Sequence, residues 1–193
     1  TDDAGRRVEA GAGGEARRNA MSKRNTMQAE VTLESVLEAA NLKRAWKAVK
    51  ANAGAAGVDG RDIESTRSHL KAHWESIAHK LKAGEYRPGA IRAVPIPKAN
   101  GGTRTLGIPN VQDRLIQQAI LQALTPVFDP GMSEHSYGFR PQRSAHDAID
   151  AARAHVAAGK TWVVDIDLKS YFDQINHDKL MHAVSRQVRD KTL

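Results

Sequence analysis

Residues 161–180, TWVVDIDLKSYFDQINHDKL, decide how the rest of the chain is interpreted. The segment begins with apolar residues and then alternates acidic with apolar ones, which is the pattern of a β-strand with side chains on opposite faces. Asp165 and Asp167 therefore share one face, about 6–7 Å apart along the strand. Acids on such a face need cations or water around them, and Mg²⁺ binds one or two carboxylates together with substrate phosphates. These residues alone leave two interpretations open, a metal site and a solvated edge strand.

The composition limits the class of protein. The chain has 193 residues, which is enough for about one domain or one and a half, and 40% of them are hydrophobic, which is enough to form a core. It has no cysteine, which excludes disulfides, a thiolate zinc site and a cysteine nucleophile. No apolar run is long enough for a membrane helix, and the first residues lack the apolar core of a signal peptide. The net charge of +7 favours a polyanionic partner, although charge alone does not separate nucleic acid from an anionic membrane surface.

The first third of the chain has a flexible and a helical part. Residues 1–30 are rich in Gly, Ala and Arg without apolar periodicity, so we expect a flexible basic leader there. Thr32 is a suitable N-cap for a helix over 33–50. Apolar residues at steps of three and four predict a second helix over 64–82.

Residues 91–108 have the pattern of a β-hairpin. The arms IRAVPIP and TRTLGIP flank Asn100 and Gly101, a dipeptide that favours a tight turn. Prolines in the first arm lack the N–H that a ladder needs, which favours an edge or protruding hairpin. Lys98 lies at the start of the tip and Arg104 just beyond it, so both can reach an anion.

A largely buried helix is predicted over 111–125, because apolar residues recur there every four positions. Asn110 stands at its expected N-cap. Asp113 lies in its first turn, where a negative charge suits the helix dipole. Pro126 is expected to end the helix.

The loop at 129–143 brings Tyr137, Phe139, Arg140 and Arg143 close together in sequence. Aromatic rings with arginines form surfaces on which bases stack and phosphates bind. A loop whose aromatic residues pin it to the core explains the same composition equally well.

Two further helices are predicted beyond this loop. Ser144 and Asp147 have the spacing of a capping box before a helix over 145–157. We therefore interpret them, with His146, as a helix start rather than as a hydrolytic triad. An amphipathic pattern predicts another helix over about 177–190.

Four blocks of the sequence together resemble a known family. They are RAVPIPKANGGTRTLGIP, VQDRLIQQAILQAL, HSYGFRPQRSAHDAI and VVDIDLKSYFDQINHDKL. Their order and spacing are similar to those of the reverse transcriptases of bacterial group II introns, RNA-directed DNA polymerases that also act as maturases in RNA splicing and intron mobility. The resemblance covers residues 31–193. The stretch TLESVLEAANLKRAWKAVKANAGAAGVDG is similar to the N-terminal extension of these enzymes.

The resemblance implies an α+β fold, the fingers and the first part of the palm of a right-hand polymerase. The fold would be mostly helical, with a fingertip β-hairpin and a palm strand that carries the catalytic Asp. Residues 1–30 would then be the basic leader, 31–90 the N-terminal extension and first fingers helices, 91–160 the rest of the fingers, and 161–193 the truncated start of the palm.

The resemblance also implies roles for individual residues. Asp167 would be the catalytic, metal-binding carboxylate, the backbone carbonyl of Leu168 would reach a metal, and Asp165 is a further candidate ligand. The implied dNTP-binding residues are Lys98, Arg104, Ser170, Tyr171 and Phe172. The ring of the last would exclude a 2′-hydroxyl. The implied contacts to template and nucleotide are Phe139, Arg140 and Arg143.

The implied chemistry agrees with the residue types. Phosphoryl transfer by two metal ions needs acids for the metals and cations for the triphosphate. The expected cofactor is therefore Mg²⁺, two ions in the complete enzyme. The expected partners are intron RNA as template, a DNA primer and dNTPs, with no membrane partner, in the bacterial cytoplasm.

The sequence also departs from the family. The aromatic–Ala–Asp–Asp turn of the second palm motif does not occur in it, nor do a thumb or an X domain. We therefore expect an incomplete catalytic domain that is inactive by itself. Two alternatives remain, a non-catalytic module that binds intron RNA, and a reverse transcriptase of a retron, a diversity-generating element or a CRISPR system.

Overall fold

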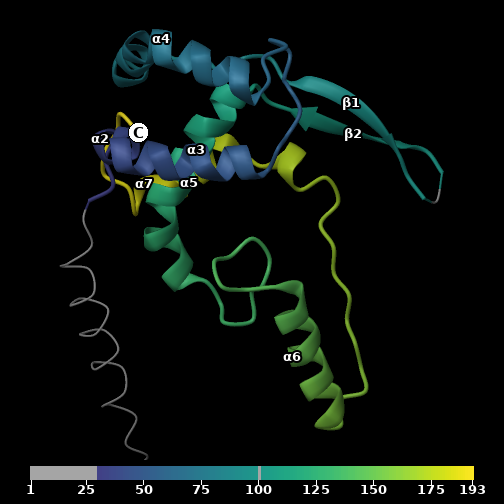
Figure 1. The fold of residues 1–193 in the computed structure, drawn as a ribbon. Coiled ribbons are helices and arrows are strands. Elements are labelled where there is room, and N and C mark those ends of the chain that lie inside the picture. The colour runs from purple at the N-terminus through teal and green to yellow at the C-terminus, as the bar shows by residue number, and fades with distance from the viewer. Residues whose placement is uncertain (1–29, 100) are drawn as a thin grey trace, which may run out of the picture. The chain divides into compact units, whose positions relative to one another are not determined.

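The computed structural model describes residues 30–99 and 101–193, so the predicted leader lies outside the described residues except for Glu30. This part of the chain is mainly helical, with one antiparallel pair of strands (Figure 1). The elements are α2 (Leu33–Leu37), α3 (Ala39–Ala51), α4 (Ile63–Lys82), β1 (Arg92–Pro97), β2 (Thr103–Ile108), α5 (Val111–Phe128), η1 (Asp129–Gly131), α6 (Ala145–Ala157), η2 (Phe172–Gln174) and α7 (His177–Ser185). The mixed fold class is confirmed at this level.

The helix predicted over 33–50 is divided in two. Thr32 caps α2 as predicted, because its hydroxyl accepts a hydrogen bond from the amide of Ser35 at 3.2 Å. The prediction of one continuous helix was wrong, because the chain leaves the helical conformation at Glu38, where ψ is 137°, before α3 begins.

Asn41 explains how the chain tolerates this break. Its buried amide nitrogen donates to the carbonyl of Val36 at 2.8 Å and to that of Ala119 in α5 at 3.0 Å. Its amide oxygen accepts from Gln122 of α5 at 2.9 Å. One side chain thus joins α2, α3 and α5, and its own buried polar atoms all have partners, which removes the cost of enclosing them.

The core lies around α5. Helices α2, α3 and α4 all pack against it, and α3 crosses it in Figure 1. The central apolar cluster consists of Val36, Ala45, Leu70, Ile77, Leu115 and Ala119. Trp46 and Trp74 are partly buried at its edge. Val31–Leu193 form one compact unit, and no helix in the described ranges is both long and apolar enough to cross a membrane.

Two details of the predicted α5 differ in the structure. The helix continues through Pro126 to Phe128, so its predicted end at the proline was wrong. A proline removes a single backbone donor, and the amide of Asp129 again bonds back to the carbonyl of Thr125. Asn110 stands at the N-cap position, but its side-chain oxygen accepts from the amide of Asp59 at 3.2 Å instead of capping the helix.

The hairpin is confirmed. Strands β1 and β2 pair antiparallel, with register from Arg92 opposite Ile108 to Pro97 opposite Thr103. At the tip, Asn100 lies outside the described residues. The amide of Gly101 donates to the carbonyl of Lys98 at 3.1 Å. Gly101 itself has φ +87°, a left-handed conformation that glycine adopts easily.

The prediction of a β-strand that carries Asp167 was wrong. Residues 160–168 form neither strand nor helix, and Val164 is 82% exposed. A β-strand exists only through hydrogen bonds to a neighbour. Among the described residues β1 and β2 pair only with each other, so the alternating segment has no partner strand.

The two last helices were predicted with partial success. Helix α6 has the predicted bounds and a capping box of Ser144 with Asp147. Helix α7 ends at Ser185 rather than near residue 190. The chain turns away because Asp190 accepts a hydrogen bond from the amide of Leu33 at 2.7 Å, which a continuing helix would not allow.

Replacing Asn41 by Ala should destabilise the fold by about 1–3 kcal/mol, because it removes the buried hydrogen bonds that join α2 and α3 to α5 and leaves the amide of Gln122 without its side-chain acceptor. Urea unfolding followed by circular dichroism measures this. Asn52→Ala is the matched control, since Asn52 is an exposed C-cap residue. Equal losses in the two variants would contradict a special role for Asn41.

Candidate nucleic-acid interface

The hairpin tip carries the two predicted phosphate-binding cations. Lys98 directly follows β1, and Arg104 lies in β2 opposite Ile96. Both side chains are exposed, and neither forms an ion pair with another residue in the described ranges. They are therefore free to meet an anion from outside.

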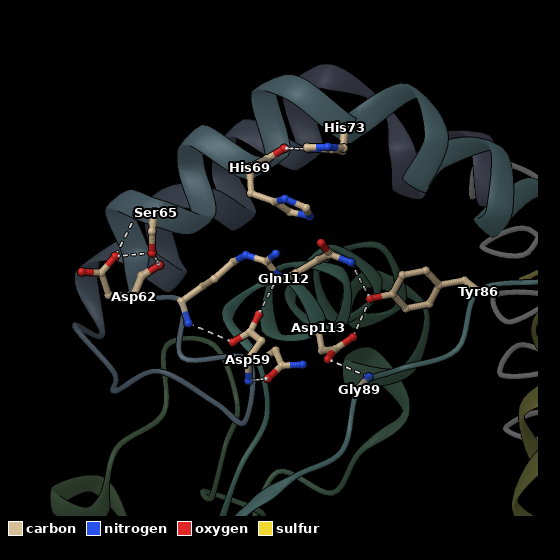
Figure 2. Close-up of polar contacts among 11 residues, drawn as sticks. Asp59, Asp62, Ser65, His69, His73, Tyr86, Gly89, Gln112 and Asp113 are labelled. Carbon is tan, nitrogen blue, oxygen red and sulfur yellow. Dashed lines mark hydrogen bonds and ion pairs between the residues drawn. The ribbon is translucent and has the colours of Figure 1, made fainter.

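The hairpin is anchored where it leaves the core, around Asp113 in the first turn of α5 (Figure 2). Asp113 is only 4% exposed. Its carboxylate accepts from the hydroxyl of Tyr86 at 2.5 Å and from the amide of Gly89 at 3.1 Å. Gln112 donates to the same hydroxyl at 3.1 Å. Burial, and then the hydrogen bond to Asp113, raise the pKa of Tyr86, so its hydroxyl stays protonated.

The adjacent residues of α5 hold a second loop. The Arg114 guanidinium donates to the carbonyl of Ala55 at 2.5 Å. Asn110 receives the amide of Asp59. A Cβ at Gly57 would lie 2.7 Å from the backbone of Asn110, so only glycine fits this approach.

Sequence reasoning assigned Asp113 only a favourable place in the helix dipole. The available signal was its spacing, because Asp113, Ile116 and Ile120 follow one another at steps of three and four. An acid in an apolar stripe indicates a buried carboxylate with specific donors. The donors to Asp113, the Tyr86 hydroxyl and the Gly89 amide, have no sequence pattern around them that predicts this contact.

In the loop after α5, Arg140 is an anchor. Its side chain is 8% exposed, and its Nε lies 2.8 Å from Oδ1 of Asp129. It also donates to the carbonyls of Ser133 at 2.6 Å and Ser136 at 3.0 Å. The hydrogen bond from Arg140 holds the pKa of Asp129 below its usual value. These bonds shape the loop from inside.

The other two residues predicted to contact the template are exposed beside this anchor. Phe139 is fully exposed and has φ +54°, so the alternative in which it pins the loop to the core is wrong. A non-glycine residue in this conformation is under strain, and such strain is concentrated at functional sites. The guanidinium of Arg143 lies 5.6 Å from the ring centroid of Tyr137, within the range of a cation–π contact.

One hollow of about 520 Å³ lies between the loop, α3 and α5. Its lining includes Phe139, Arg140 and Arg143. The residues that complete it are Arg44, Gln118, Leu121, Gln122, Thr125, Pro126 and Pro141. Three arginines, neutral polar groups and an exposed aromatic ring make a surface suited to nucleic acid. Arg44 was not predicted, because it belongs to a distant helix.

The acidic segment presents its groups to solvent. Asp165, Asp167 and the side chain of Leu168 are all exposed. Immediately after them, Ser170 has φ +51° and Tyr171 has φ −52°. Successive residues with opposite φ turn their amides toward one side, which makes an anion-binding concavity. The exposed ring of Phe172 contacts Tyr171 edge-on, with centroids 5.4 Å apart.

Of the residues predicted from the sequence, Phe139, Arg140 and Arg143 line one hollow. Lys98 and Arg104 share the tip of the hairpin. The described residues contain no group of three or more His, Asp or Glu side chains arranged for a metal ion. Asp165 and Asp167 are nevertheless a donor pair of the hard-oxygen type that Mg²⁺ prefers.

Residues 96–191 match the family model described as reverse transcriptase (RNA-dependent DNA polymerase). The chain belongs to the reverse transcriptase family. The match starts inside β1, so α2, α3 and α4 precede it.

Three relatives from this family show what the chain is similar to. Protein YkfC of Escherichia coli K12 is 41% identical over 138 residues, which are 69% of this chain and 36% of that protein. The group II intron-encoded protein LtrA of Lactococcus lactis subsp. cremoris is 37% identical over 117 residues, 60% of this chain and 19% of LtrA. The putative COX1/OXI3 intron 1 protein of Saccharomyces cerevisiae is 33% identical over 132 residues, 68% of this chain and 16% of that protein. The chain thus spans about a third or less of these relatives, and the predicted resemblance to group II intron proteins is confirmed.

The loop between residues 129 and 143 should loosen in acid. A carboxylate with a lowered pKa contributes stability above its ordinary pKa of about 4, and this contribution is lost as the pH falls through the lowered value. The protection factors of the loop amides, which correct for the intrinsic pH dependence of hydrogen exchange, should therefore fall below that pH. Asp129→Asn should show fast exchange already at neutral pH, whereas exposed Asp150→Asn on α6 should leave the pH profile unchanged. A flat profile in the unmutated chain would contradict the prediction.

Proposed function

We propose that this chain is the fingers and the first palm segment of a group II intron reverse transcriptase with a maturase role, an RNA-directed DNA polymerase of right-hand architecture. Its substrates are dNTPs, an RNA template and a DNA primer. Because the chain spans a limited share of its relatives, the activity is proposed for the full-length protein that contains it.

One observation carries the proposal. Within six residues the chain presents an exposed acid, Asp167, a turn with opposed φ at Ser170 and Tyr171, and an exposed ring at Phe172. An acid for a metal, amides for a phosphate and a bulky group for a sugar are the three requirements of nucleotide selection. Along the chain the acid comes first, then the amides and then the ring, which matches the order of metal-bound phosphate and sugar in a nucleotide.

The remaining residues have complementary roles in this proposal. Lys98 provides a point charge and Arg104 a planar donor pair for the triphosphate. Phe139 stacks on a template base, and Arg143 meets the template phosphates. Arg140 contributes by holding the loop in shape through Asp129.

The proposed cofactor is Mg²⁺, held by Asp167 and the carbonyl of Leu168, with Asp165 as a further candidate ligand. When bound, the metal ion neutralises phosphate charge and orients the reacting groups. The residues of this chain position the triphosphate beside it.

In the full-length protein, Asp167→Ala should reduce primer extension on an RNA template on the order of 10³-fold, because it removes a carboxylate that holds the metal. RNA affinity, measured by filter binding, should stay nearly unchanged. Asp150→Ala, an exposed acid on α6, is the control and should keep full activity. Normal synthesis by the Asp167 variant would show that another carboxylate binds the metal. Robust dNTP incorporation by residues 1–193 alone would contradict the expected inactivity of this chain by itself.

Lys98→Ala and Arg104→Ala should each raise the KM for dNTP about tenfold with a smaller effect on kcat, because each removes a charge-assisted phosphate contact. Steady-state primer extension measures both constants. If template affinity falls instead while the dNTP KM is unchanged, the hairpin contacts the template.

A second candidate function is intron-RNA binding without catalysis, favoured by the hollow lined by Arg44, Arg140 and Arg143. Primer extension by the full-length wild-type protein separates the two, and the variant Arg44→Ala combined with Arg143→Ala tests whether the hollow binds RNA. In a binding module the double variant should weaken RNA affinity, and the full-length wild-type protein should make no DNA. Synthesis by the wild-type protein would exclude this candidate.

A further inference from the structure

Both ends of the hairpin meet the first turn of α5. On the β1 side, Gly89 lies three residues before β1 and donates its amide to Asp113. On the β2 side, only Pro109 separates Ile108 from Asn110. Arg92 at the start of β1 also donates to the carbonyl of Ala56 at 3.3 Å, in the loop that Asn110 and Arg114 hold.

Beyond these ends the hairpin has little support. Most residues of both strands are exposed, and no residue of either strand is buried. In the described part of the chain the only extensive packing partner of β1 is β2. The direction in which the tip points is therefore set at its base, since a rigid two-stranded ribbon transmits a small rotation of its base into a large displacement of its tip.

The contact at the base is unusually specific. Asp113 is buried and has two donors from one short loop, the Tyr86 hydroxyl and the Gly89 amide. A Cβ on Gly89 would collide with the Asn110 side chain and lie 3.4 Å from Oδ2 of Asp113. The close approach thus needs a glycine on one side and a carboxylate on the other.

We infer that Asp113 is a positioning residue for nucleotide binding, which through Tyr86 and Gly89 fixes the base of the hairpin and thereby the place of Lys98 and Arg104. The inference rests on the proposed function for its consequence in catalysis. Its structural content, that Asp113 sets the direction of the hairpin, stands apart from activity and is tested first.

The absence of cysteine from the chain allows clean spin labelling. Thr103→Cys on β2 and Glu75→Cys on α4, both exposed, provide two label sites. Pulsed electron–electron double resonance then gives the distribution of distances between the two spin labels, one near the hairpin tip and one on the core, in the 193-residue chain. We expect one narrow distribution, which Asp113→Asn broadens about twofold or more. The Tyr86 hydroxyl and the Gly89 amide donate to different oxygens of Asp113, and asparagine replaces one of these oxygens by an NH2 group that cannot accept.

Two further variants keep the test decisive if Asp113→Asn folds poorly. Tyr86→Phe keeps the ring and removes one donor, and Gly89→Ala displaces the loop without changing any charge. Both should broaden the distribution while thermal unfolding remains cooperative. Asp150→Asn is the control and should leave it narrow. A distribution that stays narrow in every folded variant overturns the inference, whatever the activity of the protein.

In the full-length enzyme, Tyr86→Phe and Gly89→Ala should raise the KM for dNTP several-fold, with kcat and template affinity within about twofold of the wild type. A merely structural role would lower the amount of active enzyme, and hence kcat, without changing KM. Broadened distances with an unchanged KM would refute the catalytic consequence. A wild-type enzyme without synthesis would refute the proposed function and leave the distance result standing.

Discussion

A buried carboxylate at the start of α5 organises this structure. Asp113 accepts from a hydroxyl and a backbone amide, and its neighbours Asn110 and Arg114 bond to a second loop. Burial makes the two bonds of Asp113 hard to lose, because an unpaired polar group in the core costs more than a bond exposed to water contributes. Since the core helices also pack on α5, this one helix both carries the core and determines where the hairpin begins.

The chain separates the residues that hold its shape from those proposed to bind substrate. Asn41, Asp113 and Arg140 are buried or nearly so, and each has several partners within the chain. Lys98, Phe139 and Asp167 are exposed. A side chain that already has its hydrogen bonds inside the protein has little left for a ligand. Arg140 illustrates the difference, because it lines the hollow yet donates mainly to its own loop.

Local signals predicted the local structure well. The capping residues Thr32 and Ser144 mark true helix starts, since a cap acts over three residues and needs nothing else. The hairpin was predicted from its turn and its two arms for the same reason. The failures have long-range causes. Asn41 bonds to α5 and stabilises a break at Glu38, and Asp190 bonds to Leu33 and draws the chain out of α7.

The sequence by itself determined the family, the helical segments, the hairpin and the types of residue that nucleotide chemistry requires. These follow from spacing along the chain, which survives without knowledge of the fold. Only the tertiary structure decided that Asp113 is a buried anchor, that Phe139 is exposed while Arg140 is enclosed, and that residues 160–168 have no partner strand among those described. The physical reason is that burial and strand pairing depend on residues far away in the chain, and a single stretch of sequence cannot name its own partners.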